Sequence, residues 1–361
     1  MSKVRLIDIC QPKQWKTIPT SQLTKEGYPV YGANGKIGFY SEYNHEKETI
    51  LITCRGATCG SLNISEPFSY VNGNAMCLDN LDDSVLLKYL YYNLCGYNFS
   101  KVISGTAQPQ ITGEGLSKVV LNIHSANEQK IIVDLIEKLE KILISQDLYY
   151  QKLDELIKSR FVEMFGDPKI NIYCFEKKNL KESCDIITGN TPSRANAEYY
   201  GNHIEWIKTD NILTNQLYPS QADEFLSVDG MNVGRCVDKG SILMSCIAGS
   251  LSSIGRVCIT DRKVAFNQQI NALVPKDYNV IFLYVLLLLS KDYLLEGINM
   301  ALKGILSKSG LGNKQLIIPP TDLQNQFADF VTKVEQQKST VQKSIDKLET
   351  LKKSLMQKYF G

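Results

Sequence analysis

The sequence has few histidines, and none of them stands at a metal-binding spacing. Only three occur in 361 residues, at His45, His124 and His203. This excludes the paired-histidine helix of zinc proteases. The ten cysteines are scattered, without a repeated CxxC pair or a Cys/His zinc spacing. We therefore expect free, reduced cysteines in a cytosolic protein, and no metal bound by the chain.

Long hydrophobic runs are also missing. The most apolar window, Val280–Leu289, is about half the roughly 20 residues that a membrane-spanning helix needs, so it predicts a buried helix. The first five residues, Met1 to Arg5, are not followed by the apolar run of a signal peptide. We expect a cytoplasmic protein with no membrane partner.

Neither sign of charge is in excess. Lys and Arg number 40 against 38 Asp and Glu, for a net charge of +2. A protein that binds nucleic acid mainly through phosphates carries a stronger positive bias. Any nucleic-acid role must therefore depend on local patches, on base contacts, or on basic partner subunits.

Motifs for catalysis are absent as well. Gly35-Lys36 is followed by Ile37, where a phosphate-binding loop needs Ser or Thr for the metal. Pro319-Pro320 is flanked by Ile318 and Thr321, whereas adenine amino-methyltransferases require a polar residue before the prolines and an aromatic residue after them. Cys54 or Cys59 could still serve as a nucleophile, although no histidine shares a motif with either. We expect the chain not to be an enzyme.

What the sequence does contain is a long internal repeat. Shifting residues 60–166 onto 255–361 by a constant offset aligns Asn72 with Asn267 and, at the end of each copy, Phe165 with Phe360. The period is too long for a solenoid repeat, so the unit is a whole domain plus a helix. Two equivalent halves should present two equivalent surfaces, which suggests a partner that is itself bipartite.

Both copies end in a long segment with helical periodicity. Apolar residues alternate at three- and four-residue spacing in the same register in both copies, flanked by Lys and Glu. Heptads sustained over about five turns predict a coiled coil. We expect the two helices to form an antiparallel pair rather than to lie independently on their own domains. The expected packing residues are Ile132, Leu135, Leu139, Ile142, Tyr149, Leu153, Leu156, Phe327, Phe330, Val334, Val341, Leu348, Leu351 and Leu355.

The segment before each helix has a different composition. It is rich in Gly, Asn, Thr and Tyr, with short β-prone runs such as 49–53 and 241–245 bounded by turn residues. Prolines mark the junctions. We expect an α+β fold with a pseudo-twofold repeat, in which two globular domains are separated by two long antiparallel helices. The expected boundaries are 1–124 for the first domain, 125–166 for the central helix, 167–320 for the second domain and 321–361 for the C-terminal helix.

Several motifs in both halves resemble those of one protein family. The first half contains YPVYGANGKIGFY (28–40), ILITCRGATCG (50–60), VNGNAM (71–76) and GTAQPQIT (105–112). The second half contains TGNTPSRANAEYYGNHIEWIKTD (188–210), SIGRV (253–257) and NQQ (267–269). These stretches resemble the target-recognition domains of the specificity (S) subunit of type I restriction–modification systems. The resemblance covers essentially the whole chain, in the order recognition domain, spacer helix, recognition domain, spacer helix.

The resemblance implies a DNA-reading subunit. Each recognition domain would read one half of a bipartite target in double-stranded DNA, and the helices would act as a ruler between the halves. Two methyltransferase (M) subunits would bind S-adenosylmethionine and methylate adenine at N6, and restriction (R) subunits would use ATP and Mg²⁺. No cofactor is expected on this chain. Two alternatives stay open: a specificity subunit of a Type IIB-like enzyme, and a coiled-coil scaffold protein without a DNA role.

Base reading requires amides, hydroxyls and Arg or Lys side chains on loops held by a rigid scaffold. The candidates in the first half are Asn34, Lys36, Arg55, Thr58, Asn74, Lys101, Thr106, Gln108 and Gln110. Those in the second half are Thr191, Ser193, Arg194, Lys208, Thr209, Asn211, Arg256, Gln268, Gln269, Lys303 and Lys308. The alternative for each amide or hydroxyl is a turn former that satisfies its own backbone. Trp206 is either a stacking platform or a core residue.

Overall fold

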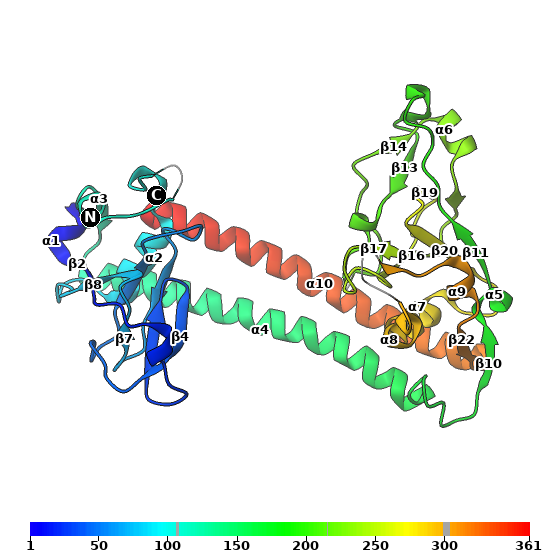
Figure 1. Cartoon of the computed structure of the whole chain (residues 1–361), viewed down its shortest axis with the longest axis horizontal. Coiled ribbons are helices and arrows are strands. Elements are labelled where there is room, and N and C mark those ends of the chain that lie inside the picture. The colour runs from blue at the N-terminus through cyan, green and yellow to red at the C-terminus, as the bar shows by residue number, and fades with distance from the viewer. Residues whose placement is uncertain (106–107, 215, 299–303) are drawn as a thin grey trace. The chain divides into compact units, whose positions relative to one another are not determined.

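The computed structural model describes residues 1–105, 108–214, 216–298 and 304–361 (Figure 1). The chain divides into two compact units. Unit 1 contains Met1–Leu148 and Gln342–Gly361, and unit 2 contains Tyr149–Val341. Each unit is α+β, as the sequence predicted. Within the described residues, no helix combines the length and the apolarity that crossing a bilayer requires.

Unit 1 is built on a four-stranded antiparallel sheet of order β2-β8-β5-β6. Beside it are a three-stranded sheet, β4-β3-β7, and a two-stranded sheet, β1-β9. The strands are β1 (Ser2–Arg5), β2 (Gln11–Gln14), β3 (Tyr28–Gly32), β4 (Gly35–Tyr40), β5 (Ile50–Thr53), β6 (Leu62–Ile64), β7 (Tyr70–Val71), β8 (Ala75–Asp79) and β9 (Val120–Ile123). The helices before the long one are α1 (Leu6–Ile9), α2 (Leu87–Gly96) and α3 (Gly113–Ser117), with 3-10 turns at Thr20–Gln22 and Phe99–Lys101.

The central strands of unit 1 are apolar on both faces. Successive side chains of a strand point to opposite sides, so Met76 and Leu78 of β8 join the main core with α2. Ala75 and Cys77 of the same strand join a smaller core with Tyr31. A strand buried on both faces reads as a continuous apolar run, which is the character of 50–54 and 75–78.

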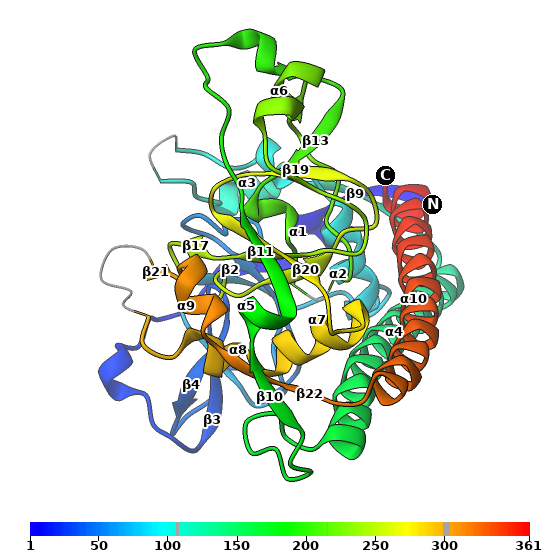
Figure 2. The same cartoon turned by 90° about the vertical axis from the view of Figure 1, so that its right-hand side faces the viewer.

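Unit 2 repeats the order of the four-stranded sheet, as β11-β20-β16-β18, and the parallel strand pair, because β13 pairs with β19 as β3 pairs with β7. Its second sheet has the order β12-β14-β13-β19-β15, with five strands where that of unit 1 has three; β11, β20, β13 and β19 can be followed in Figure 2. The strands are β10 (Glu176–Asn179), β11 (Cys184–Thr188), β12 (Tyr200–Gly201), β13 (Ile204–Ile207), β14 (Phe225–Leu226), β15 (Cys236–Val237), β16 (Ile242–Ser245), β17 (Ile247–Ala248), β18 (Val257–Ile259), β19 (Val264–Phe266), β20 (Ile270–Pro275), β21 (Gly304–Ile305) and β22 (Gln315–Ile318). The short helices are α5 (Leu180–Ser183), α6 (Val228–Val233), α7 (Val280–Leu289), α8 (Lys291–Leu295) and α9 (Lys308–Gly312), with 3-10 turns at Ala197–Tyr199 and Thr209–Asn211. The apolar window of the sequence is α7, a buried helix rather than a membrane span.

The two long helices are equal in length. Helix α4 (Ala126–Phe165) and helix α10 (Thr321–Phe360) each contain 40 residues and correspond residue for residue in the repeat. Ser125 and Glu128 exchange hydrogen bonds at the start of α4, where the Ser125 amide donates to Glu128 Oε2 at 3.0 Å. This capping box satisfies amides that a helix start leaves unpaired. Helix α10 begins directly after Pro319-Pro320, which cannot lie inside a helix.

The helices are antiparallel within each unit. In unit 2, Lys338 Nζ lies 2.7 Å from Asp154 Oδ1, and the rings of Phe161 and Phe327 are 5.4 Å apart. In unit 1, Lys352 Nζ lies 2.7 Å from Glu140 Oε1. Residue numbers rise along α4 as those of the partners fall along α10. The expected antiparallel pair is therefore confirmed.

The predicted packing residues have the period of the observed seam, but some of them are exposed and not buried. Ile132, Leu139, Leu153, Phe327, Val334 and Val341 are buried, and Phe330, Leu348 and Leu355 are half-buried. The prediction was wrong for five residues that are 38% to 48% exposed: Leu135, Ile142, Tyr149, Leu156 and Leu351. Four residues outside the expected set are buried in the helices: Ile136, Ile157, Val331 and Ile345. Ile136 and Ile157 directly follow the exposed Leu135 and Leu156, and Val331 follows the half-buried Phe330. In α4 two consecutive residues are often both apolar, and in α10 the charged residues Lys338 and Lys352 occupy seam positions. Apolar periodicity alone therefore does not distinguish the buried residue from its exposed neighbour.

Each long helix begins on one unit and ends on the other. Buried Gln129 ties the start of α4 to α2 of unit 1, and buried Gln324 ties the start of α10 to the segment before α7 of unit 2. At the far ends, Phe165 packs against Phe282 of unit 2 with ring centroids 4.9 Å apart, and Phe360 packs against Tyr89 of unit 1 at 5.5 Å. The two halves of the repeat therefore exchange their helix ends.

Candidate nucleic-acid interface

Three loops of unit 1 meet where β3 and β5 end. Asn34 lies in the β3–β4 turn, and its Oδ1 accepts a 2.6 Å hydrogen bond from the hydroxyl of Thr58 in the loop after β5. Arg55 of that loop forms an isolated antiparallel bridge with Gln110. Gly56, the next residue, has a φ of 89°, a conformation that favours glycine. The side chains of all four polar residues are exposed.

A fourth loop, which contains Gly73 and Asn74, is joined to this group through the buried sulfur of Cys54. The thiol of Cys54 donates to the backbone oxygen of Asn74 at 3.1 Å. Gln14, at the end of β2, donates to Gly73 O at 3.1 Å and to Cys54 Sγ at 2.9 Å. The sequence had not singled out Gln14, whose only signal was its place at the end of a short strand. The side chain of Asn74 is exposed beside it.

The remaining candidates of unit 1 are less closely tied. Lys36 is exposed, lies 3.4 Å from Glu66 Oε1, and sits over the ring of Phe39 at 4.6 Å from its centroid. Lys101 and Gln108 are exposed on the segment that leads to Gln110. Thr106 lies outside the described residues.

In unit 2, two cations converge on one carboxylate above an aromatic pair. Arg194 Nη2 lies 2.6 Å from Glu224 Oε2, and the ammonium of Lys208 pairs with the other carboxylate oxygen. The Arg194 guanidinium stands 4.5 Å from the ring centre of Tyr200 and 5.2 Å from that of Trp206. Stacked cations of this kind are held in fixed orientations. The hydrogen bond from Lys208, together with Arg194, holds the pKa of Glu224 below its usual value despite its partial burial.

The loop that carries Arg194 is pinned to the same aromatic residues. Tyr200 donates its hydroxyl hydrogen to Pro192 O at 2.6 Å, and the indole of Trp206 donates to Asn190 O at 3.3 Å. Trp206 is only 3% exposed, so it is a core residue that supports the loop and not a stacking platform. The sequence criterion of amides, hydroxyls and basic side chains did not include carboxylates, so it did not predict a role for Glu224.

Other candidates of unit 2 fall into two groups. The hydroxyl of Thr191 donates to Gln268 Oε1, which joins the 189–194 loop to the β19–β20 turn that also holds Gln269. Ser193 is exposed next to Arg194, and Thr209 is half-buried. Arg256 donates to Ser252 O of its own loop at 3.2 Å. Lys308 is exposed and lines a hollow with Lys181 and Asn313, and Lys303 lies outside the described residues.

Asn211 is a structural residue, contrary to expectation. It is 7% exposed, and its amide donates to Ser220 Oγ at 3.2 Å and to Gln221 O at 3.1 Å. Its oxygen accepts from the Lys208 backbone amide at 2.9 Å. A side chain with its donors and acceptor used inside the fold has nothing left to offer a base, so it is the turn former of the alternative reading.

The cysteines once considered as nucleophiles have no activating partner among the described residues. Cys54 is fully buried and donates to a backbone oxygen. Burial raises the pKa of the Cys59 thiol, which keeps it protonated and unreactive. Polar loops that are held rigidly on a sheet can bind a ligand in an orientation set by hydrogen bonds, and this is what both units offer.

Comparison with known proteins agrees with this arrangement. The family model of the type I restriction modification DNA specificity domain matches residues 1–151 and 174–350. The HindI specificity subunit of Haemophilus influenzae is 37% identical over 105 residues, which are 28% of this chain and 22% of that protein. A putative specificity subunit of the same species, S.HindORF215P, is 22% identical over 338 residues, 89% of this chain and 83% of that one. The chain thus matches only about a fifth of the length of the first of these relatives.

Solved structures show the same fold. The S subunit of a type I restriction–modification system from M. genitalium has a TM-score of 0.65 and 16% identity, over 100% of this chain and 96% of that chain. A second, from work on complex assembly of the type I system, has a TM-score of 0.60 and 15% identity, over 99% and 97%. Because the family model covers most of the sequence in two copies, the chain belongs to the type I restriction–modification specificity subunit family.

Proposed function

We propose that this chain reads a bipartite target in double-stranded DNA, with one half-sequence read by each unit. The observation that supports this most directly is the duplication of one sheet topology, each copy carrying exposed amides, hydroxyls and a basic side chain on joined loops. Major-groove edges of bases are distinguished by donors and acceptors of this kind. The chain takes no part in the methylation or cleavage chemistry.

In unit 2 the proposed reading group is Arg194 and Lys208, with Thr191 and Gln268. Arg194 is fixed in orientation by Tyr200, Trp206 and Glu224, so little conformational entropy is lost when its guanidinium meets the O6 and N7 atoms of guanine. Glu224 is itself an acceptor that suits the amino group of cytosine. In unit 1 the corresponding group is Asn34, Arg55, Thr58, Asn74 and Gln110.

Weak net charge agrees with a division of labour between subunits. In unit 2 both cations of the reading group, Arg194 and Lys208, share the carboxylate of Glu224. In unit 1 the further candidate Lys36 lies beside Glu66, so this chain offers base contacts with little excess positive charge. Phosphate contacts position a protein on DNA without reading sequence. We assign that role to two methyltransferase subunits, which also bind S-adenosylmethionine, with restriction subunits that use ATP and Mg²⁺ joining them.

A second apolar stripe on α4 supports docking of partner subunits. Leu135, Ile142, Tyr149 and Leu156 are seven residues apart and 38% to 47% exposed, so they form a line that the α4–α10 seam leaves open. A heptad-spaced apolar line is what a further helix packs against. We assign it to helices of the methyltransferase subunits.

DNA binding with and without partners tests this proposal. We expect the chain alone to bind DNA weakly in gel-shift titrations, and addition of the methyltransferase subunits to raise affinity and sequence specificity together. Nanomolar, sequence-specific binding by the chain alone would contradict the division of labour. Failure of the assembled complex to prefer any sequence would instead favour a scaffold protein without a DNA role.

A further inference from the structure

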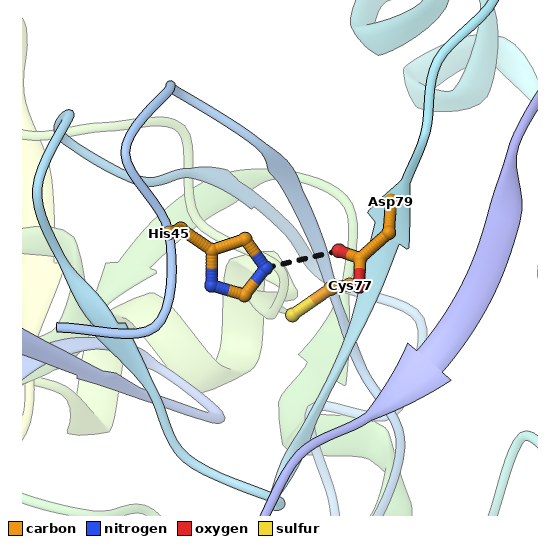
Figure 3. Close-up of side chains that lie close together, drawn as sticks. All are labelled: His45, Cys77 and Asp79. Carbon is orange, nitrogen blue, oxygen red and sulfur yellow. Dashed lines mark hydrogen bonds and ion pairs between the residues drawn. The ribbon is translucent and has the colours of Figure 1, made fainter.

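Three potential metal ligands meet in unit 1, two of them on β8 and one on the segment before β5. Nε2 of His45, Sγ of Cys77 and a carboxylate oxygen of Asp79 all lie within 4.8 Å of one another (Figure 3). Cys77 and Asp79 are alternate residues of β8, so both side chains point to the same face of the sheet. His45 reaches them from the segment before β5, 32 positions earlier (77 − 45), so no sequence spacing reveals the group.

The hydrogen bonds around His45 fix the orientation of its ring. The amide of Asn44 is oriented by Val71, because its Oδ1 accepts from Val71 N at 2.7 Å and its Nδ2 donates to Val71 O at 3.0 Å. That same Oδ1 can only accept and lies 2.7 Å from His45 Nδ1, so Nδ1–H donates to it. A neutral imidazole then presents the lone pair of Nε2 to Asp79 Oδ1, 2.9 Å away.

Two lone pairs cannot face each other at that distance without a cation between them. The cation is either a proton or a metal ion. Metal-binding histidines in proteins donate their other ring N–H to an oxygen, and metal-binding carboxylates are themselves hydrogen-bonded. Both outer contacts exist here, since Asn44 accepts from His45 and the indole of Trp15 donates to Asp79 Oδ2 at 3.0 Å.

The repeat shows that the fold does not need this polar group. In unit 2, Ala272 and Val274 of β20 take the places of Cys77 and Asp79, in a sheet of the same order. The register agrees, because Cys77 faces Lys13 across β2 and Ala272 faces Ile187 across β11. The unit 1 residues are therefore a feature of unit 1 itself, and unit 2 shows that the same strand packs with apolar residues.

We propose that His45 Nε2, Cys77 Sγ and Asp79 Oδ1 bind one zinc ion per chain, with water in the fourth position. Nitrogen, thiolate and carboxylate oxygen are the donors that Zn²⁺ takes in proteins. Ligand atoms about 2.0–2.3 Å from a tetrahedral zinc lie roughly 3.3–3.6 Å apart. His45 Nε2 and Asp79 Oδ1, now 2.9 Å apart, would therefore move apart by about 0.4 Å, and Cys77 Sγ, within 4.8 Å of the other two ligand atoms, would move inward by at most about 1.5 Å. The thiol proton of Cys77 and any proton held between His45 and Asp79 leave to solvent on binding. The ion joins the 41–49 segment to β8.

Metal content of the full-length chain tests this. The protein is incubated with excess ZnCl₂, separated by gel filtration and analysed by mass spectrometry for zinc. We expect about one zinc per chain for the wild type, and loss of that zinc in Cys77→Ala and Asp79→Val, which introduce residues that unit 2 already holds at these places. Cys258→Ala, at a buried cysteine of unit 2, is the matched control and should retain the zinc.

Cobalt substitution gives a second readout that does not depend on bulk content. Co²⁺ in this site should show thiolate-to-cobalt charge-transfer absorption, present in the wild type and Cys258→Ala and lost in Cys77→Ala. Two results overturn the proposal. If the wild type and Cys77→Ala both retain no zinc, a proton and not a metal ion lies between His45 and Asp79. If all variants retain the same amount of zinc, the binding is adventitious.

Discussion

The side chain of Gln129 accepts a hydrogen bond from the backbone amide of Leu86 at 2.8 Å, which joins the start of α4 to the start of α2. Gln324 accepts from the amide of Asn279 at the same distance, 2.8 Å, in unit 2. Each glutamine also donates to two backbone oxygens, Ser84 and His124 in unit 1, and Asp277 and Pro319 in unit 2. One amide thus satisfies three backbone groups in each copy of the repeat.

Replacing either glutamine by methionine should destabilise its own unit. Gln129 is 1% and Gln324 0% exposed, and removal of the amide takes a hydrogen-bond partner from one backbone N–H and two backbone carbonyls in each unit. Each such group costs about 1–3 kcal/mol, and we expect Gln129→Met and Gln324→Met to lose roughly 3 kcal/mol each. Urea unfolding gives the loss, and hydrogen exchange should localise it to the starts of α2 and α7. Gln326→Met, at an exposed position of α10, is the control, and equal losses in control and variants would contradict this role.

Lys338 is a buried charge in the helix seam and should be costly to remove. It is 4% exposed, with Asp154 Oδ1 at 2.7 Å and Glu335 Oε1 at 2.9 Å. Burial acts to lower the pKa of Lys338, but the two carboxylates outweigh it and the pKa is raised. Its contribution to stability is therefore full below the unfolded pKa of lysine, about 10.4, and is lost only as pH rises through the higher folded value.

Lys338→Leu should accordingly destabilise unit 2 by about 3 kcal/mol at pH 7, because two carboxylates lose their partner. The repeat places Leu143 at the same position of α4, so leucine fits such a seam. We expect Lys338→Leu combined with Asp154→Leu to recover most of the loss, as well-packed apolar residues replace a buried pair with little cost. Thermal and urea unfolding measure both. A double variant no more stable than Lys338→Leu would show that the lysine does more than balance Asp154.

Arg194→Ala should weaken binding of the assembled complex to its target while leaving the fold intact. A bidentate base contact contributes about 1–3 kcal/mol, so we expect a loss of roughly 5- to 150-fold in affinity for the cognate sequence. Binding to unrelated DNA should change much less. Lys239→Ala is the control, because Lys239 is exposed but precedes β16, whereas the proposed reading loops lie beyond the other end of that strand. Equal losses on cognate and unrelated DNA would make Arg194 a phosphate contact.

Glu224→Gln should strengthen binding to unrelated DNA, whereas Arg194→Ala should weaken binding to the cognate sequence. The carboxylate neutralises Arg194 and Lys208, and its lowered pKa keeps it ionised well below neutral pH. Removal of that charge frees two cations for phosphates, so binding to unrelated DNA should tighten and fall more steeply with salt. Discrimination between cognate and unrelated DNA should drop. Competition binding at two salt concentrations measures both, and unchanged discrimination would rule Glu224 out as a specificity determinant.

The sequence was most informative where one physical rule acted alone. The repeat and the heptad period predicted two equal helices, because a buried stripe demands apolar residues every three or four positions. The rule failed at Leu135 and Ile136, because these two consecutive residues are both apolar. Only packing against the core determines that Ile136 is the buried one. It failed again at Lys338, whose ammonium is stabilised in the seam by two carboxylates. A pattern of apolar residues does not take such ion pairs into account.

The candidate sites were less predictable, for a different reason. Glu224 and Asn211 lie 13 residues apart (224 − 211), yet Glu224 pairs with Arg194 and Asn211 closes its own turn. His45 meets Cys77 only after the strands have paired. Contacts between residues distant in sequence are set by the register of the sheet, which single-sequence patterns do not specify.

Lengthening both helices should change the spacing of the target and not its sequence. The pair of Glu140 and Lys352 fixes the register of the two helices. Because the helices are antiparallel, Gln146, six residues after Glu140, lies opposite Asp346, six residues before Lys352. A seven-residue insertion after Gln146 of α4 therefore faces one placed before Asp346 of α10. One heptad restores the seam on both sides. It adds about 10.5 Å of helix, and at 3.4 Å per base pair we expect the unread gap to lengthen by up to about three base pairs.

Methylation sequencing of a host that carries the variant and the methyltransferase subunits reads the new target directly. Both half-sequences should stay as they are in the wild type, because no residue of the reading loops is altered. Insertion into α4 alone is the control and should abolish methylation, since it puts the two seams out of register. Altered half-sequences with an unaltered gap would show that α4 and α10 do not set the spacing, while leaving the assignment of the reading loops to be judged by Arg194→Ala.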